Sequence, residues 1–164
     1  ISADLRQLSI SPVTVVCAGP KAILDIPKTV EILESLGVPL ISYKTHNIPA
    51  FWSRDSEIKS PVVMNSIEEI VQARLIQSRI GIGGGQLICN PIPKKHEIKK
   101  EIIEPIIKKA IQNSVNKSIS GKSLTPFLLD QVFKLTDGDS LRANIELLLN
   151  NVKLASKIAS KINC

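Results

Sequence analysis

The chain has 164 residues, of which 43% are hydrophobic and 22% are charged, with a formal net charge of +6. This length and apolar content are typical of one compact domain and exclude an intrinsically disordered chain. No apolar run approaches the roughly 20 residues of a membrane-crossing helix, so we expect no membrane partner. Three widely spaced cysteines, Cys17, Cys89 and Cys164, fit neither a disulfide framework nor a paired zinc site, which favours a reducing compartment and a cytoplasmic location.

The positive charge is weak evidence for a polyanionic partner. Lysines concentrate in stretches such as 94–109 and 153–161, where solvated helix faces explain them. Aromatic residues make up 3% of the chain and lysine far outnumbers arginine, whereas nucleic-acid-binding proteins usually carry stacking aromatics or arginine-rich stripes. We therefore expect no nucleic-acid partner.

The N-terminal third has the pattern of a βαβ unit. The apolar run 13–18 between Pro12 and Gly19 predicts a strand buried on both faces. Residues 27–36 have helical periodicity, and 38–43 predict a second strand. Strand, helix and strand within so few residues predict a parallel pair with a right-handed crossover, and hence an α/β fold, a mainly parallel sheet flanked by helices.

The rest of the chain continues this pattern without a second domain. We expect a loop over 48–61, a helix over 66–78 and one more strand over 86–89. Two amphipathic helices follow. The first would bury Ile98, Ile102, Ile106 and Ala110, and the second, over 141–162, would bury Leu147, Leu148, Val152, Ala155 and Ala159.

Lys21 is the candidate nucleophile. It lies just beyond the predicted strand 13–18, and ligands of open α/β sheets bind at the carboxyl ends of parallel strands. A lysine that loses hydration there can attack a carbonyl carbon and form a Schiff base. The alternative is an ordinary solvated surface lysine.

Other polar residues allow two interpretations each. Ser2, Ala3 and Asp4 open the chain, and Asp4 would either bind a sugar hydroxyl or metal-bound water or help to cap a helix. Asn144 would lie on the first turn of a helix capped by Ser140 or Asp139 and face either solvent or a ligand.

Two further features carry little functional signal. His46 and His96 are far apart in sequence and lack neighbouring ligand types, so neither indicates a metal site. The glycines of 81–85 suggest a phosphate loop only weakly, because they precede a predicted strand instead of joining a strand to a helix.

Several short motifs follow one another along the whole chain, and together they resemble the pseudouridine-5′-phosphate glycosidase family. They are Ile1-Ser2-Ala3-Asp4-Leu5, Val15-Val16-Cys17-Ala18-Gly19-Pro20-Lys21-Ala22-Ile23-Leu24-Asp25, Gly37-Val38-Pro39-Leu40, Pro49-Ala50-Phe51, Asn90-Pro91-Ile92-Pro93, Gly121-Lys122, Thr125-Pro126-Phe127-Leu128-Leu129, and Ser140-Leu141 with Asn144. The resemblance implies that residues 1–164 are the C-terminal portion of a single glycosidase domain.

The resemblance also implies an activity and a site. The family cleaves the C–C glycosidic bond of pseudouridine 5′-phosphate reversibly to uracil and ribose 5-phosphate, and breakdown is the expected direction in cells. Lys21 matches the lysine that attacks the anomeric carbon of the opened ribose. Ser2, Ala3 and Asp4 match a substrate-binding motif at the sugar or phosphate, and Asn144 matches an asparagine near the base.

Parts of the family site have no counterpart in this chain, which opens at Ile1. The proton-donating glutamate, a phosphate-binding lysine and a glycine-rich segment would lie upstream, and the aspartate that binds Mn²⁺ would fall just before Ile1. We therefore expect a sheet truncated on its N-terminal side with an exposed edge, no metal site in this chain, no turnover by this chain alone, and a homotrimer only when complete. Trp52 and Asp137 are smaller departures, where the family usually has Phe and Gly.

Two alternatives from other functional classes stay open. A degenerate, noncatalytic remnant that serves as a binding module would keep the fold without the activity, although the retained Lys21 argues against it. Nucleic-acid binding through the basic face would require salt-dependent affinity for a polynucleotide.

Overall fold

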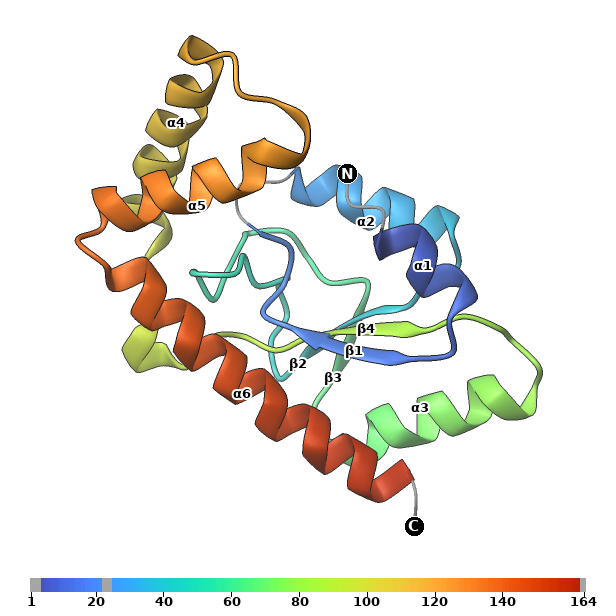
Figure 1. Ribbon diagram of the computed structural model, residues 1–164. Coiled ribbons are helices and arrows are strands. Elements are labelled where there is room, and N and C mark those ends of the chain that lie inside the picture. Colours follow the sequence, from blue (N-terminus) through green and yellow to red (C-terminus); the bar gives the residue numbers. More distant parts are fainter. Residues whose placement is uncertain (1–3, 22–24, 163–164) are drawn as a thin grey trace.

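The structure, a computed structural model, describes residues 4–21 and 25–162, except the side chain of Lys122. Its centre is a parallel four-stranded sheet in the order β1-β4-β2-β3 (Figure 1). The strands are β1 (Thr14–Cys17), β2 (Leu40–Tyr43), β3 (Val62–Met64) and β4 (Gln86–Cys89). The predicted α/β fold with a mainly parallel sheet is confirmed.

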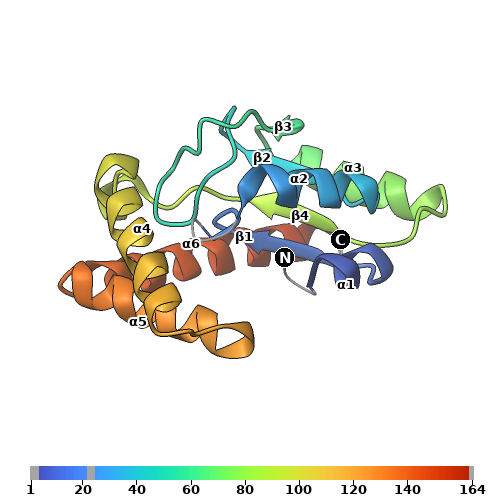
Figure 2. The same cartoon turned by 90° about the horizontal axis from the view of Figure 1, so that it is seen from above.

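Helices cover both faces of the sheet, as Figure 1 shows. On one face α1 (Asp4–Ile10) and α2 (Ile26–Ser35) enclose a core with Leu40 and Leu87, and on the other α3 (Ile67–Arg79) and α6 (Asp139–Ile162) enclose a core with Ile41 and Ile88. A pair of helices, α4 (Lys100–Asn116) and α5 (Leu124–Leu135), packs together at one end of the molecule (Figure 2). Short 3₁₀ turns, Lys94–His96 and Gly121–Ser123, precede α4 and α5.

Local signals placed most of these elements correctly. Asp25 Oδ1 accepts a hydrogen bond from Lys28 N (3.0 Å) and caps α2, and Ser66 caps α3 in the same way through Glu69 N (3.2 Å). The predicted strand 86–89 has the bounds of β4. Two elements were not predicted, β3 and α5. The start of α6 also differs, because Thr136 Oγ1 accepts from Ser140 N (3.2 Å) and neither Asp139 nor Ser140 acts as the cap there.

The predicted apolar faces of two helices were right only in part, with Ala110 and Leu147 buried as expected. α4 begins only at Lys100 and buries Ile103, Ile107 and Ala110, whereas Ile102 is 58% exposed. In α6, Leu147 is buried as predicted, but Leu148 is 60% exposed. The physical reason is that both helices carry more than one apolar stripe. Packing against α5 selects the stripe that α4 buries, and packing against the sheet and α3 selects that of α6.

The predicted exposed edge and apolar surface are both present. Within the described residues β1 pairs only with β4, which leaves its other side open, and Val13 and Val15 are exposed. The second stripe of α6, which we call the α6 stripe, is also exposed and consists of Leu141, Ile145, Leu148 and Val152. A row of large exposed apolar side chains like this one is typical of a face that another polypeptide covers. Among the described helices, none is long and apolar enough to cross a membrane.

The glycines before β4 have a structural role. A Cβ on Gly85 would lie 2.4 Å from the carbonyl oxygen of Val13, and one on Gly84 would lie 2.6 Å from that of Ser9. These glycines let the end of α1 approach the start of β4, where Gly85 N donates to Leu8 O (2.7 Å). This close packing explains Gly84 and Gly85 of the glycine-rich segment 81–85.

We predict that Gly85→Ala lowers the free energy of unfolding by about 1–3 kcal/mol, because the added methyl group meets fixed backbone atoms. Gly83→Ala is the matched control two residues earlier, where a Cβ would meet nothing within 4 Å. Urea denaturation followed by circular dichroism measures both. Equal stabilities for the two variants would contradict the packing argument.

Candidate active site

The turn that carries Lys21 is held by backbone contacts at the carboxyl edge of the sheet. Asn90 N donates to Cys17 O (2.7 Å), and Phe51 N donates to Ala18 O (3.0 Å). Gly19 has a φ of 88°, and a Cβ there would lie 1.8 Å from the carbonyl oxygen of Pro49, so only glycine fits. Lys21 follows this turn directly and is half-buried. The structure thus places Lys21 where the sequence predicted, beyond the end of β1.

Residues 49–54, which contact this turn, are themselves held in place by hydrogen bonds. Arg54 donates from Nη1 to the carbonyl oxygen of Ile92, and its backbone N donates to Glu97 Oε1 (2.8 Å). Ile98 N donates to Trp52 O (2.9 Å). Phe51 has a φ of 63°, which is strained for a residue with a side chain. These bonds keep the segment in one conformation against the Lys21 turn.

Asn144 is held by a tryptophan. Its Oδ1 accepts a hydrogen bond from Trp52 Nε1 (2.7 Å), which also lies 3.3 Å from Ser140 O. Trp52 is 1% exposed, so this bond is shielded from water. Because the oxygen of Asn144 is engaged, its NH₂ group is the part that can donate to a ligand. Trp52, which departs from the usual Phe of the resemblance, therefore orients Asn144.

A pair of asparagines joins β4 to α6. Asn90, the residue after β4, donates from Nδ2 to Asn151 Oδ1 (3.1 Å), and both side chains are buried. Asn150 Nδ2 donates to Pro91 O (3.1 Å). Trp52, Asn90 and Asn151 were not predicted as site residues. Of these three, Asn90 could have been found from the sequence, because it directly follows a predicted strand at the edge where ligands bind.

The candidate residues Lys21, Asn144 and Asp4 lie toward the same end of the sheet and differ in burial. Ala18 packs in one apolar cluster with Trp52 and Ala143, which brings the Lys21 turn and the start of α6 together. Asp4 lies in the first turn of α1 and is exposed. The last turn of α1 packs on Gly84 and Gly85 at the start of β4, so Asp4 lies at the helix end that points toward the carboxyl edge. Ser2 and Ala3 fall outside the described residues.

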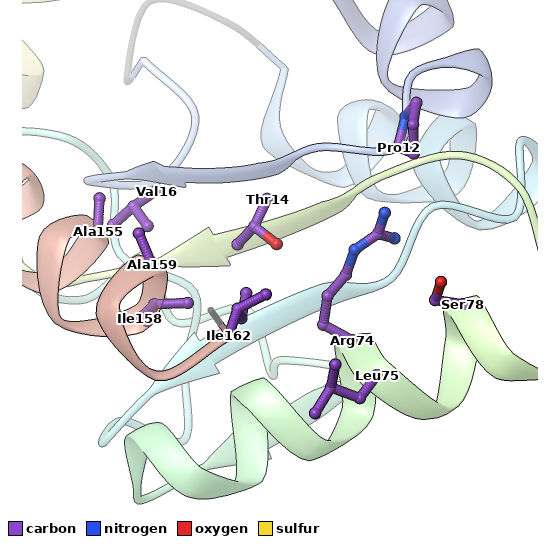
Figure 3. Close-up of a pocket in the computed structure, with 10 residues that line it drawn as sticks. All are labelled: Pro12, Thr14, Val16, Arg74, Leu75, Ser78, Ala155, Ile158, Ala159 and Ile162. Atoms are coloured by element: carbon purple, nitrogen blue, oxygen red, sulfur yellow. The ribbon is translucent and has the colours of Figure 1, made fainter. Parts of the chain in front are cut away.

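Two of the cavities in the described part of the chain lie near the candidate residues and β1. One of about 270 Å³ lies between α4 and the start of α2, lined by Ile26, Ala50 and Ser53 among others. The other, of about 420 Å³, lies between β1, α3 and α6 (Figure 3). Its wall is mainly apolar, and its one charged residue, Arg74, donates to Gly84 O (3.0 Å). Lys21, Asp4 and Asn144 do not line it, so this second cavity is a hollow beside the open edge of β1.

The part of the chain that the structure describes offers no cluster of ligands for the Mn²⁺ ion that the resemblance implies. Over residues 4–21 and 25–162 no three His, Cys, Asp or Glu side chains come together in a way that could hold a metal ion. His96 instead lies 3.3 Å from Glu146 Oε2 on α6. We assign no chemical step to a metal.

Comparisons with known proteins identify the family. Residues 1–161 match the family described as indigoidine synthase A like protein. The chain belongs to this family. Among relatives named pseudouridine-5′-phosphate glycosidase, those of Jannaschia sp. and Legionella pneumophila are 50% and 52% identical over 97% of this chain. The alignments cover 53% and 51% of those relatives, so the chain spans about half the length of the curated relatives it matches.

Solved structures show the same fold. An indigoidine synthase A-like protein from Thermotoga maritima is 34% identical and superposes with a TM-score of 0.89 over all of this chain and 54% of its own. The prealnumycin C-glycosynthase AlnA, solved in complex with ribulose 5-phosphate, is 28% identical with a TM-score of 0.91 over 99% of this chain and 53% of its own. The family fold therefore extends beyond the part that this chain supplies.

We predict that Trp52→Phe lowers the free energy of unfolding by about 1–3 kcal/mol, because it removes the buried indole N–H that donates to the half-buried Oδ1 of Asn144. Asn144→Asp, which keeps an oxygen acceptor for the indole, is the matched control and should cost less. Thermal unfolding followed by circular dichroism suits both variants, since Trp52 is the only tryptophan and its removal abolishes tryptophan fluorescence. A Trp52→Phe protein as stable as the parent would rule out an energetic role for this bond.

Proposed function

We propose that this chain supplies the lysine-bearing half of an enzyme that cleaves the C–C glycosidic bond of pseudouridine 5′-phosphate to uracil and ribose 5-phosphate, reversibly. The observation that carries the proposal is the position of Lys21. It follows β1 at the carboxyl edge of a parallel sheet, in a turn fixed by Ala18, Gly19 and the 49–54 segment. That edge is where α/β enzymes bind ligands.

The substrate class is supported by the relatives. Those at 50% and 52% identity are named after pseudouridine 5′-phosphate, and the AlnA structure contains a pentose phosphate. Asn144 fits the base end of such a substrate, because its NH₂ group can donate to a uracil carbonyl while Trp52 fixes the side chain. Asp4 fits the sugar end, because a carboxylate accepts hydrogen bonds from hydroxyl groups.

The chemistry requires an amine at the anomeric carbon. The C1′–O4′ bond breaks first, O4′ takes the proton that uracil N1 gives up, and C1′ becomes doubly bonded to C5. Lys21 Nζ then adds to C1′, the electron pair of that double bond and the amine proton return to uracil, and the nitrogen lone pair drives formation of an iminium. The C1′–C5 bond breaks, its electron pair goes to uracil, and uracil takes up a proton at C5. Water hydrolyses the iminium, which releases ribose 5-phosphate and regenerates the lysine. An amine suits this task because its nitrogen lone pair stabilises the positive charge that develops at C1′ when the electron pair of the C–C bond leaves with uracil.

The half of the relatives that this chain does not span also bears on the activity. We propose that turnover requires the groups that relatives carry in the half this chain does not span, among them the proton donor. The homotrimeric state and the cytoplasmic location belong to the same proposal. On this reading the 164-residue chain alone forms neither uracil nor a ribose adduct at an appreciable rate.

The test is reductive trapping in the complete protein. Incubation with pseudouridine 5′-phosphate and borohydride should give a ribose 5-phosphate adduct on Lys21, located by peptide mass spectrometry, together with release of uracil. Lys21→Arg keeps the positive charge but cannot form a Schiff base, so adduct and uracil should both vanish. Lys28→Arg, an exposed lysine on α2, is the matched control and should keep both.

Two results would overturn the proposal. Uracil release that persists in Lys21→Arg, or an adduct on another lysine, would remove Lys21 as the nucleophile. A well-folded complete protein with neither adduct nor uracil would leave the noncatalytic binding module as the better account.

A further inference from the structure

Two cysteines lie side by side at the ends of neighbouring strands. Cys17 ends β1, Cys89 ends β4, and the two are direct partners in the parallel register. Both side chains belong to the apolar cluster under α1 and α2, so they point to the same face of the sheet. Neighbouring strands lie about 4.7–4.9 Å apart, which falls within the roughly 4.4–6.8 Å between Cα atoms that a disulfide requires.

The two thiols are not equivalent. Cys89 is fully buried, whereas Cys17 lies on the edge strand and is half-buried. Cys89 donates a hydrogen bond to the sulfur of Cys17, which lowers the pKa of Cys17, and the backbone N–H of Gly19 lowers it further against the opposing effect of burial. Donating that bond raises the pKa of Cys89, and burial raises it more. Cys17 is therefore the thiol that ionises first, and it is the more exposed residue of the two.

We propose that Cys17 and Cys89 are a reversible dithiol–disulfide pair, in which a peroxide oxidises Cys17 and Cys89 then closes the disulfide. This site goes beyond the proposed function and does not depend on it, because it rests on the strand register and on the shared face of the two side chains.

The chemistry balances in two steps. The Cys17 thiolate attacks one oxygen of hydrogen peroxide and breaks the O–O bond, which gives a sulfenic acid and hydroxide. The sulfur of Cys89 then attacks the sulfenic sulfur, the S–O bond breaks, and water leaves with the proton of Cys89. The two cysteines lose two electrons and the peroxide gains them. A dithiol reductant reverses the reaction by thiol–disulfide exchange.

The position of the pair gives the disulfide a structural effect. Cys17 O already accepts a hydrogen bond from Asn90 N (2.7 Å), so the ends of β1 and β4 are joined by their backbones. A disulfide adds a covalent link at the same level, immediately before the Ala18-Gly19 turn that leads to Lys21. Oxidation would thus restrict the movement of the Cys17 and Cys89 side chains next to that turn.

The test is disulfide mapping on the folded protein carrying Cys164→Ser, so that the two strand-end cysteines are the only thiols of this chain. After peroxide treatment and alkylation in denaturant, mass spectrometry should show one cross-linked peptide pair containing Cys17 and Cys89, two hydrogen masses below the reduced pair. Dithiothreitol should restore both free thiols. In Cys89→Ala, peroxide should leave a sulfenic acid on Cys17 that dimedone traps, and in Cys17→Ala, Cys89 should stay reduced.

A second measurement tests the order of reaction. Since the hydrogen bond from Cys89 lowers the pKa of Cys17, the pH profile of Cys17 alkylation by iodoacetamide should move to higher pH in Cys89→Ala. Circular dichroism confirms that each variant is folded. The proposal fails if both cysteines stay alkylatable at a peroxide dose that oxidises glutathione, or if Cys17 passes to sulfinic acid without forming the disulfide. It fails equally if Cys89 is labelled by dimedone in Cys17→Ala.

Discussion

The contact between the Gly19 backbone and the Pro49 carbonyl organises the candidate site. It leaves no room for a side chain on Gly19, and the neighbouring bond from Phe51 N to Ala18 O fixes the same two segments together. Through Trp52, the next residue, this contact extends to Ser140 and Asn144 at the start of α6. A turn after β1, a loop after β2 and the last helix therefore meet at one place. Displacing any one of them disturbs the surroundings of Lys21.

Local sequence patterns predicted three of the four strands, β1, β2 and β4, because each of these is a short apolar run bounded by residues that end strands. The run 86–89 became β4 without change, and the capping residues Asp25 and Ser66 start α2 and α3. Helix faces were harder to predict. In α6, Leu147 and Leu148 are equally apolar neighbours, and only packing in the cluster with Trp52, Ile92 and the helices α4 and α5 decides that Leu147 is buried. β3 and α5 lacked distinct boundary signals and depend on packing against β2 and α4.

The site was predictable where it follows chain order and unpredictable where it depends on long-range contacts. Lys21 could be assigned from its place after a strand, and the resemblance singled out Asn144. The bond between Trp52 and Asn144 joins residues 92 positions apart, and that between Asn90 and Asn151 joins residues 61 positions apart. No local periodicity in the sequence indicates such pairs. They become visible only when the fold brings α6 across the ends of β1 and β4.

The open side of β1 has a dynamic consequence. A strand paired on one side frays more readily than one paired on both, so within the described sheet the backbone amides of β1 should exchange hydrogen faster than those of β4. The turn with Lys21 continues directly from this less protected strand. Any polypeptide that adds a strand beside β1 would therefore also damp the fluctuations of the lysine. Assembly of the domain and reactivity of its amine would then be governed by the same few backbone hydrogen bonds.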